Sequence, residues 1–121
     1  LRLSLSIRIC AAGSKKRNDH MIVTVFRSRL NPDVGEEYTE MAVRMSELAK
    51  TMPGYISHKS FTAEDGERVT IVEFESMEGQ LEWRRNAEHD EAMRLGRSTF
   101  YEEFKIQVCE TIRLSEYKKS D

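Results

Sequence analysis

The chain has 121 residues, which suits one domain with a single hydrophobic core. With 33% charged and 39% hydrophobic residues, its composition is that of an ordinary soluble globular protein. No apolar run approaches the roughly 18 residues that a membrane-spanning helix needs, so we expect no membrane partner and a cytoplasmic location.

Cysteines and histidines are few and scattered. Cys10 and Cys109 lie in different segments without a metal-binding spacing, and two cysteines do not make a disulfide framework. We therefore expect two reduced thiols. The spacing of the three histidines, His20, His58 and His89, gives no support to a zinc site, so we expect no metal.

The net charge of −2 hides a difference between two parts of the chain. Residues 1–20 carry five basic residues and one acid, a net of +4, which leaves −6 for residues 21–121. An acidic domain repels phosphate backbones, so we expect no nucleic-acid partner for the folded part. The short cluster Lys15-Lys16-Arg17 is interpreted as a solvated linker.

Residues 1–20 differ in kind from the rest of the chain. Apolar and polar residues alternate from Leu1 to Cys10, a period-two pattern that is typical of a strand. Serines and arginines interrupt the apolar stretch that a secretory signal would need. We interpret this segment as a leader or N-terminal extension, either flexible or forming an extra edge strand, with Met21 as the functional start.

The first elements of the domain are a strand and a long helix. Residues 22–29 are rich in β-branched and aromatic side chains, as strands are. Asn31 is expected to cap the helix, with Pro32 at its first position. Apolar side chains then recur at steps of three or four until Pro53-Gly54, which predicts one buried stripe on a helix of about five turns.

A β-hairpin is predicted after the helix. Residues 55–62 and 68–75 both have strand character, and the Asp65-Gly66 pair between them favours a tight turn. We therefore expect these two strands to pair in antiparallel orientation.

The last third of the domain is predicted to be a broken helix and a final strand. Ser76 can cap the helix, which we expect to break near Asn86-Ala87 and to resume over residues 88–98. The final strand is expected over residues 104–113, and residues 114–121 form a polar tail.

The element order βαββαβ predicts an α+β, ferredoxin-like domain over residues 21–113, with an antiparallel sheet covered on one face by helices. The strands carry apolar side chains in both registers, as Ile22 and Phe26 alternate with Val23 and Val25. The two helical regions of this order can cover only one face of the sheet. We therefore expect the other face to be buried in a homodimer.

Candidate site residues gather around the second helical region. Trp83 would stack on a planar ligand, Arg84 would stabilise a developing oxyanion, and His89 would exchange a proton near neutral pH. His58 and Tyr101 could line a substrate cavity. Each residue also has a structural interpretation: Trp83 as core, Arg84 as a solvated helix face, His89 as a helix cap or surface residue, His58 at the dimer seam, and Tyr101 as packing.

The segment Met21–Arg27, the pair Pro53-Gly54, the strand end Val72-Glu73-Phe74, and Trp83-Arg84 followed by His89 together resemble the antibiotic biosynthesis monooxygenase family. The resemblance covers about residues 21–113. It implies a dimeric α+β barrel, in which two ferredoxin-like subunits join sheet to sheet. Some members of this family oxidise phenolic polyketides or quinols with oxygen and without metal or flavin, and another branch degrades haem.

Three functions follow from this resemblance. The leading hypothesis is a monooxygenase that acts without a cofactor on a small aromatic or quinol-type compound, with His89 and Arg84 catalytic. The alternative is a non-catalytic, dimeric module that binds a small molecule, or that is associated with stress, and uses the same cavity. Haem binding or degradation comes third, because the haem-degrading branch carries an asparagine on the first strand, where this chain has Thr24 or Arg27.

Overall fold

The computed structural model describes residues 21–120. Its elements confirm the predicted α+β, ferredoxin-like order, with a short π-helical turn, η2, added before the last strand. The segment 1–20, expected to be a leader or an edge strand, lies outside the described residues. The elements are, in chain order, β1 (Ile22–Leu30), α2 (Glu36–Lys50), β2 (Tyr55–Thr62), β3 (Arg68–Phe74), α3 (Met77–Arg85), α4 (Ala87–Leu95), η2 (Gly96–Phe100) and β4 (Tyr101–Glu110).

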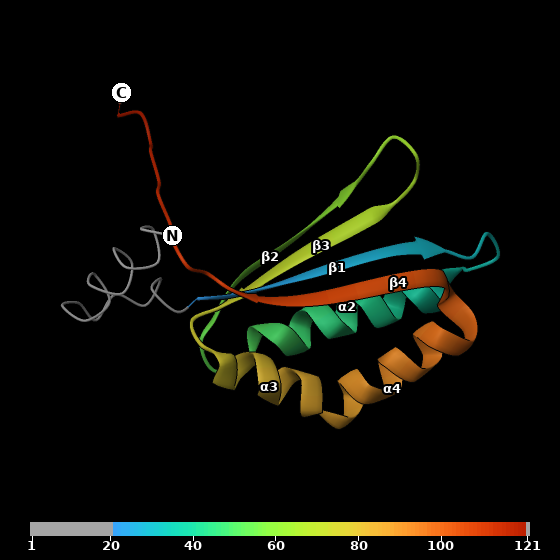
Figure 1. Ribbon diagram of the computed structural model, residues 1–121. Coiled ribbons are helices and arrows are strands. Elements are labelled where there is room, and N and C mark those ends of the chain that lie inside the picture. Colours follow the sequence, from blue (N-terminus) through green and yellow to red (C-terminus); the bar gives the residue numbers. More distant parts are fainter. Residues whose placement is uncertain (1–20, 121) are drawn as a thin grey trace.

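The four strands form one antiparallel sheet in the order β2-β3-β1-β4. Helices α2, α3 and α4 all lie on one side of this sheet, and no helix of residues 21–120 covers the other side (Figure 1). We call the two sides the helix face and the open face. Among the described helices, none is long and apolar enough to cross a bilayer.

Strand register decides which side chains reach the helix face. Ile22 lies opposite Phe74, and Thr24 lies between Val72 on β3 and Val108 on β4. Ile22, Thr24, Val72 and Phe74 are all buried. Because successive side chains of a strand point to opposite faces, the even-numbered residues of β1 and β3, and of β4 from Phe104 onward, line the helix face. A register shift at Leu30 places Tyr101 on this face as well.

The hydrophobic core lies on the helix face. Ile22, Val72 and Phe74 form its buried cluster, and Phe74 is fully buried. Three partly buried side chains from the elements around the cluster pack against it: Met52, Tyr55 and Trp83.

The open face has an apolar part and a charged part. Val23, Val25, Val69 and Ile71 are half-buried there, although no helix of the described chain covers them. Arg27 and Arg29 follow on the same face and are held in ion pairs. The homodimer expected to form through this face stays a prediction.

The start of the long helix differs from the prediction. Helix α2 begins at Glu36, with Gly35 at its N-cap, so the expected capping by Asn31 is wrong. Asn31 instead donates its backbone N–H to the Phe100 carbonyl (2.8 Å) and its side-chain Nδ2 to the Thr99 carbonyl (2.8 Å). These hydrogen bonds to the segment before β4 outweigh the local preference of Asn31 for capping a helix. Pro32 lies in a turn and not in the helix.

The predicted hairpin is confirmed. Strands β2 and β3 pair in antiparallel register across the turn that contains Asp65 and Gly66. Gly66 has a φ of +92°, a conformation that costs a residue with a side chain but not glycine. The pair was therefore a reliable local signal.

The last elements are displaced from their expected bounds. Helix α4 ends at Leu95 instead of continuing to residue 98, because the chain enters the π-helical turn η2. Strand β4 begins at Tyr101, three residues earlier than expected, since its register with β1 starts from the pair Leu30 and Tyr101. Ser76 stands at the N-cap of α3, but its side chain makes no capping hydrogen bond.

Candidate active site

The break between α3 and α4 creates the candidate site. Asn86 is extended (ψ 138°), so it ends α3, and its Oδ1 then accepts a hydrogen bond from the Glu88 N–H (2.8 Å), so it caps α4. This sharp turn brings His89 against Trp83, with ring centroids 4.6 Å apart and planes inclined by 58°. The helix break near Asn86 was predicted from the sequence, and Trp83 and His89 were both named there as candidate site residues.

An ion pair fixes the start of α4 against the long helix. The Arg44 guanidinium donates to both carboxylate oxygens of Glu88, at 2.6 and 2.7 Å. This pairing lowers the pKa of Glu88 and raises that of Arg44. Both side chains are about half exposed, so the pair adds little stability, but its two-point geometry sets the orientation of the residue that precedes His89.

Helix α3 approaches the core closely enough to place Trp83. A Cβ on Gly79 would lie 1.9 Å from the Pro53 carbonyl oxygen, so only glycine permits this contact. One turn later, the Trp83 ring packs at 5.9 Å from the ring of Phe74, partly buried against the core cluster. Trp83 is thus both a packing residue and one wall of the site.

Three buried side-chain atoms of the described chain have no hydrogen-bond partner: Thr24 Oγ1, Trp83 Nε1 and His89 Nδ1. Trp83 contacts His89 directly and packs on the cluster that contains Val72, the strand neighbour of Thr24. Leaving a buried polar group unpaired costs about 1–3 kcal/mol, and native proteins rarely tolerate it without a reason. Of the three, Trp83 and His89 are in direct contact, so their two unpaired ring nitrogens form the candidate site, and Thr24 lies on the strand next to the core cluster on which Trp83 packs.

Thr24 was missed by the sequence reasoning as a site residue. It was considered only as a position where haem-degrading relatives carry asparagine. Its side chain is 4% exposed and lies on the helix face between apolar neighbours. The available signal was a hydroxyl in the otherwise apolar register Ile22, Thr24, Phe26, but only the structure shows that no backbone group satisfies it.

The electrostatics of the site keep His89 neutral. Burial lowers its pKa, and the nearby positive charge of Arg84 lowers it further, while Asp90 acts in the opposite direction. A neutral imidazole with a buried, unpaired ring nitrogen can accept a proton from a ligand at pH 7. Arg84 itself is exposed on α3 and acts on the site through its charge.

His58 lies on the same face of the sheet, but both of its ring nitrogens are engaged. Nε2 is hydrogen-bonded to Ser46 Oγ of α2, and Nδ1 to the Tyr55 hydroxyl at 2.7 Å. These bonds tie the edge strand β2 to the long helix. His58 is therefore held in place by protein groups, in contrast to His89.

Tyr101 lies at the opposite end of the helix face from Trp83, in an aromatic cluster. Its ring contacts Phe26 at 5.4 Å, Phe104 at 5.6 Å and Tyr38 at 5.9 Å. Burial and the neighbouring Tyr38 hydroxyl raise its pKa well above the ordinary value. The hydroxyl therefore stays protonated and can only donate or accept a hydrogen bond.

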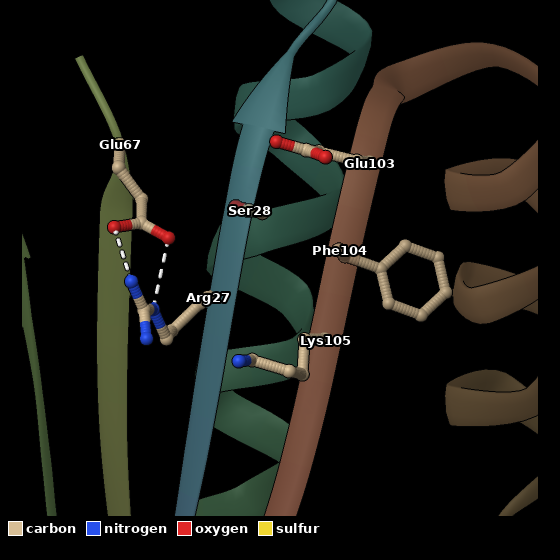
Figure 2. Close-up of a pocket in the computed structure, with 6 residues that line it drawn as sticks. All are labelled: Arg27, Ser28, Glu67, Glu103, Phe104 and Lys105. Carbon is tan, nitrogen blue, oxygen red and sulfur yellow. Dashed lines mark hydrogen bonds and ion pairs between the residues drawn. The ribbon is translucent and has the colours of Figure 1, made fainter. Parts of the chain in front are cut away.

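Two surface depressions have neither Trp83 nor His89 in their walls. One, of about 250 Å³, lies near the charged part of the open face, where Arg27 binds Glu67 at 2.8 and 2.9 Å and Phe104 points away from them (Figure 2). The other, of about 360 Å³, is a groove between α2 and α4 with the methionines Met41 and Met45 and several glutamates in its walls. Within residues 21–120, no three His, Cys, Asp or Glu side chains are placed to hold a metal ion.

The profile of the antibiotic biosynthesis monooxygenase family matches residues 21–95 of this chain. The chain therefore belongs to this family. It is also 36% identical over 76 residues to the uncharacterized protein YqjZ of Bacillus subtilis (strain 168), an alignment that covers 63% of this chain and 67% of YqjZ.

Solved structures share the fold at low sequence identity. SnoaB, a cofactor-independent oxygenase from Streptomyces nogalater, superposes with a TM-score of 0.66 at 13% identity, over 79% of this chain and 96% of SnoaB. A conserved protein from Methanosarcina mazei Go1 superposes with a TM-score of 0.67 at 14% identity, over 77% of this chain and 94% of that protein. At such identities the similarity establishes the fold alone.

Proposed function

We propose that this chain is a monooxygenase that uses molecular oxygen, without a bound cofactor, to oxidise a small aromatic compound of the phenol, quinol or anthrone type. The observation that carries the proposal is the direct contact between the Trp83 and His89 rings, each of which has a buried nitrogen without a partner among the described residues. Thr24, with its own unpaired hydroxyl, lies on the strand beside the core cluster on which Trp83 packs. Family membership and the fold shared with SnoaB, itself a cofactor-independent oxygenase, support it.

The chemistry of the three groups fits a phenol. A hydroxyl and an indole N–H can donate hydrogen bonds, whereas a neutral imidazole nitrogen can accept a proton. His89 would remove the phenolic or enolic proton, and Thr24 and Trp83 would hold the oxyanion that results. The Trp83 ring would stack on the flat substrate.

The proposed reaction balances for anthrone. Deprotonation by His89 gives an electron-rich anion, which passes one electron to O₂ and forms a radical pair with superoxide. Recombination makes a carbon–oxygen bond as a hydroperoxide, and loss of water leaves the ketone. The substrate gains one oxygen atom and loses two hydrogen atoms, and the second atom of O₂ leaves as water.

Oxygen uptake with anthrone tests this proposal. We expect the wild-type chain to accelerate uptake over buffer and His89→Gln to lose about 10²-fold or more, since general bases contribute about 10²–10⁴-fold. His58→Gln is the matched control, because His58 is bound to Ser46 and Tyr55, and it should keep most of the activity. Equal rates for wild type and His89→Gln would contradict the assigned base.

Two further measurements separate the alternatives. A rise in melting temperature with anthraquinone, without any oxygen uptake on anthrone, would instead support the non-catalytic binding module. A Soret band on titration with haemin would support haem binding. Either result would replace the monooxygenase proposal.

We also propose a homodimer joined through the open face. The half-buried apolar residues Val23, Val25, Val69 and Ile71 support it, because a face of this kind is usually covered. The dimeric barrel that the resemblance to the family implies would join two chains through this face. Light scattering at micromolar concentration should give twice the chain mass of 14.1 kDa, and a clean monomer mass would contradict the proposal.

A further inference from the structure

Arg68, at the first position of β3, stands apart from the other arginines of the sheet. It pairs in register with buried Ser28, so its side chain starts on the helix face, and its guanidinium lies 5.6 Å from the centre of the Tyr38 ring of α2. Arg27 and Arg29, on the open face, are both held by carboxylates. Among residues 21–120, no carboxylate forms an ion pair with Arg68.

Two tyrosine hydroxyls accompany this cation. The ring of Tyr38 lies 5.9 Å from that of Tyr101, and the positive charge of Arg68 is close enough to oppose the burial that raises the pKa of Tyr101. Tyr101 therefore stays protonated at neutral pH and interacts with the Tyr38 hydroxyl, beside half-buried Arg68, which has no carboxylate partner in the described chain. An arginine without a carboxylate partner, next to two tyrosines, can bind the carboxylate of a ligand.

The distance from Arg68 to the Trp83 site is short enough for one extended ligand to reach both. Arg68 and Val72 lie on the same face of β3, four residues apart, which corresponds to about 13 Å along a strand. Val72 is the neighbour of Thr24 and belongs to the cluster on which Trp83 packs. Between the two ends, the helix face presents Phe26 and Thr70, which are opposite each other in register.

We infer that Arg68, with Tyr38 and Tyr101, binds an anionic group on the far end of the substrate, so that the preferred ligand is an extended aromatic acid and not a neutral aromatic compound. This inference rests on the ligand position proposed at Trp83. Arg68 is then a specificity-determining residue that lies away from the reacting atoms.

Binding without turnover tests the inference. Anthraquinone-2-carboxylate and 2-(hydroxymethyl)anthraquinone differ only in the anionic group, and neither is an anthrone that can be oxidised. Trp83 is the only tryptophan of the chain, so quenching of its fluorescence reports binding at the proposed site. We expect wild type to bind the acid at least tenfold more tightly than the alcohol.

Substitutions of Arg68 test whether its side chain causes the preference for the acid over the alcohol. Arg68→Gln should weaken binding of the acid about tenfold and leave the alcohol within twofold, and Arg68→Lys should recover part of the loss by keeping the charge. Arg97→Gln, an exposed arginine on η2, is the matched control and should change neither constant. Melting curves show whether each variant is folded.

Several results would overturn the inference. Equal affinity of wild type for the acid and the alcohol would do so, as would an equal loss of both ligands in Arg68→Gln, which would indicate packing on Tyr38 instead of anion recognition. The proposed function is tested separately by anthrone oxidation. Acid-selective binding without oxygen uptake would keep the Arg68 site and refute the monooxygenase.

Discussion

Polar side chains have different surroundings on the two faces of the sheet. On the open face, Arg27 is satisfied by Glu67, and Arg29 by Asp65, at 2.8 to 2.9 Å. On the helix face, Thr24, Trp83 and His89 bury polar atoms that no other described group satisfies. Charges that have partners are explained by the fold itself, whereas the buried polar atoms without partners are the ones for which we propose a ligand.

The same difference separates the two internal histidines. His58 and His89 both lie between helices and sheet, but His58 has a protein partner at each ring nitrogen. His89 has a buried nitrogen without one and a neighbouring indole. The comparison indicates that the environment, and not the residue type, distinguishes a candidate base from a structural histidine.

The largest expected effect is on stability at the helix face. Phe74→Ala should lower the free energy of unfolding by about 3–5 kcal/mol, because it removes a fully buried ring from the core. Ile71→Ala, on the open face of the same strand, is the matched control. Urea unfolding measures both, and an equally large loss for Ile71→Ala at low protein concentration would show that the two faces are buried to the same degree.

Thr24→Val should separate function from stability. Valine has nearly the same shape but no hydroxyl, so it removes an unsatisfied buried group, and the free energy of unfolding should stay the same or rise by about 1 kcal/mol. Oxygen uptake on anthrone should fall about tenfold, as expected for one lost hydrogen bond to the oxyanion. Thr62→Val, on the exposed end of β2, is the control.

A clear loss of stability in Thr24→Val would contradict this account. It would mean that the hydroxyl already has a partner in the folded protein. The helix face would then contain one satisfied and two unsatisfied groups, and Thr24 would leave the proposed mechanism.

The pH dependence of His89 gives a smaller effect with a definite sign. Its pKa is lowered by burial, so folded protein binds this proton less readily than unfolded protein does. Its contribution to stability is complete above the ordinary value of 6.5 and is lost as the pH falls from there toward the lowered value. Chemical unfolding of wild type between pH 8 and 5 should therefore show a decline that is reduced in His89→Gln.

Replacing Arg84 should shift the pH at which kcat/KM falls on acidification. Its charge helps to lower the pKa of His89, so Arg84→Gln should raise that pKa toward 6.5 and shift the fall of kcat/KM on acidification to higher pH. Arg85→Gln, the adjacent exposed arginine, is the matched control. An unshifted profile in Arg84→Gln would remove Arg84 from the site.

The smallest effect is expected at the open face. Glu67→Gln breaks a partly exposed ion pair with Arg27 and should lower the thermal midpoint at pH 7 only slightly, since ion pairs open to solvent contribute little. Oxygen uptake should also stay unchanged. A large loss of activity would place the reaction on the open face and overturn the comparison between the two faces.

The sequence by itself determined the element order and the turns. The apolar stripe of α2, the Asp65-Gly66 turn and the break at Asn86 are encoded by neighbouring residues, so periodicity and turn chemistry were enough to predict them. The pairing of Trp83 with His89 was also within reach, because six residues across one helix break separate them.

Only the tertiary structure decided which polar groups are satisfied. The Asn31 bonds to residues 99 and 100, the bond of His58 to Ser46 on the long helix and the unpaired hydroxyl of Thr24 all depend on how separate elements pack together. A sequence pattern gives the face on which a side chain lies, but hydrogen-bond satisfaction requires the positions of all neighbours. The candidate site is defined by that second kind of information.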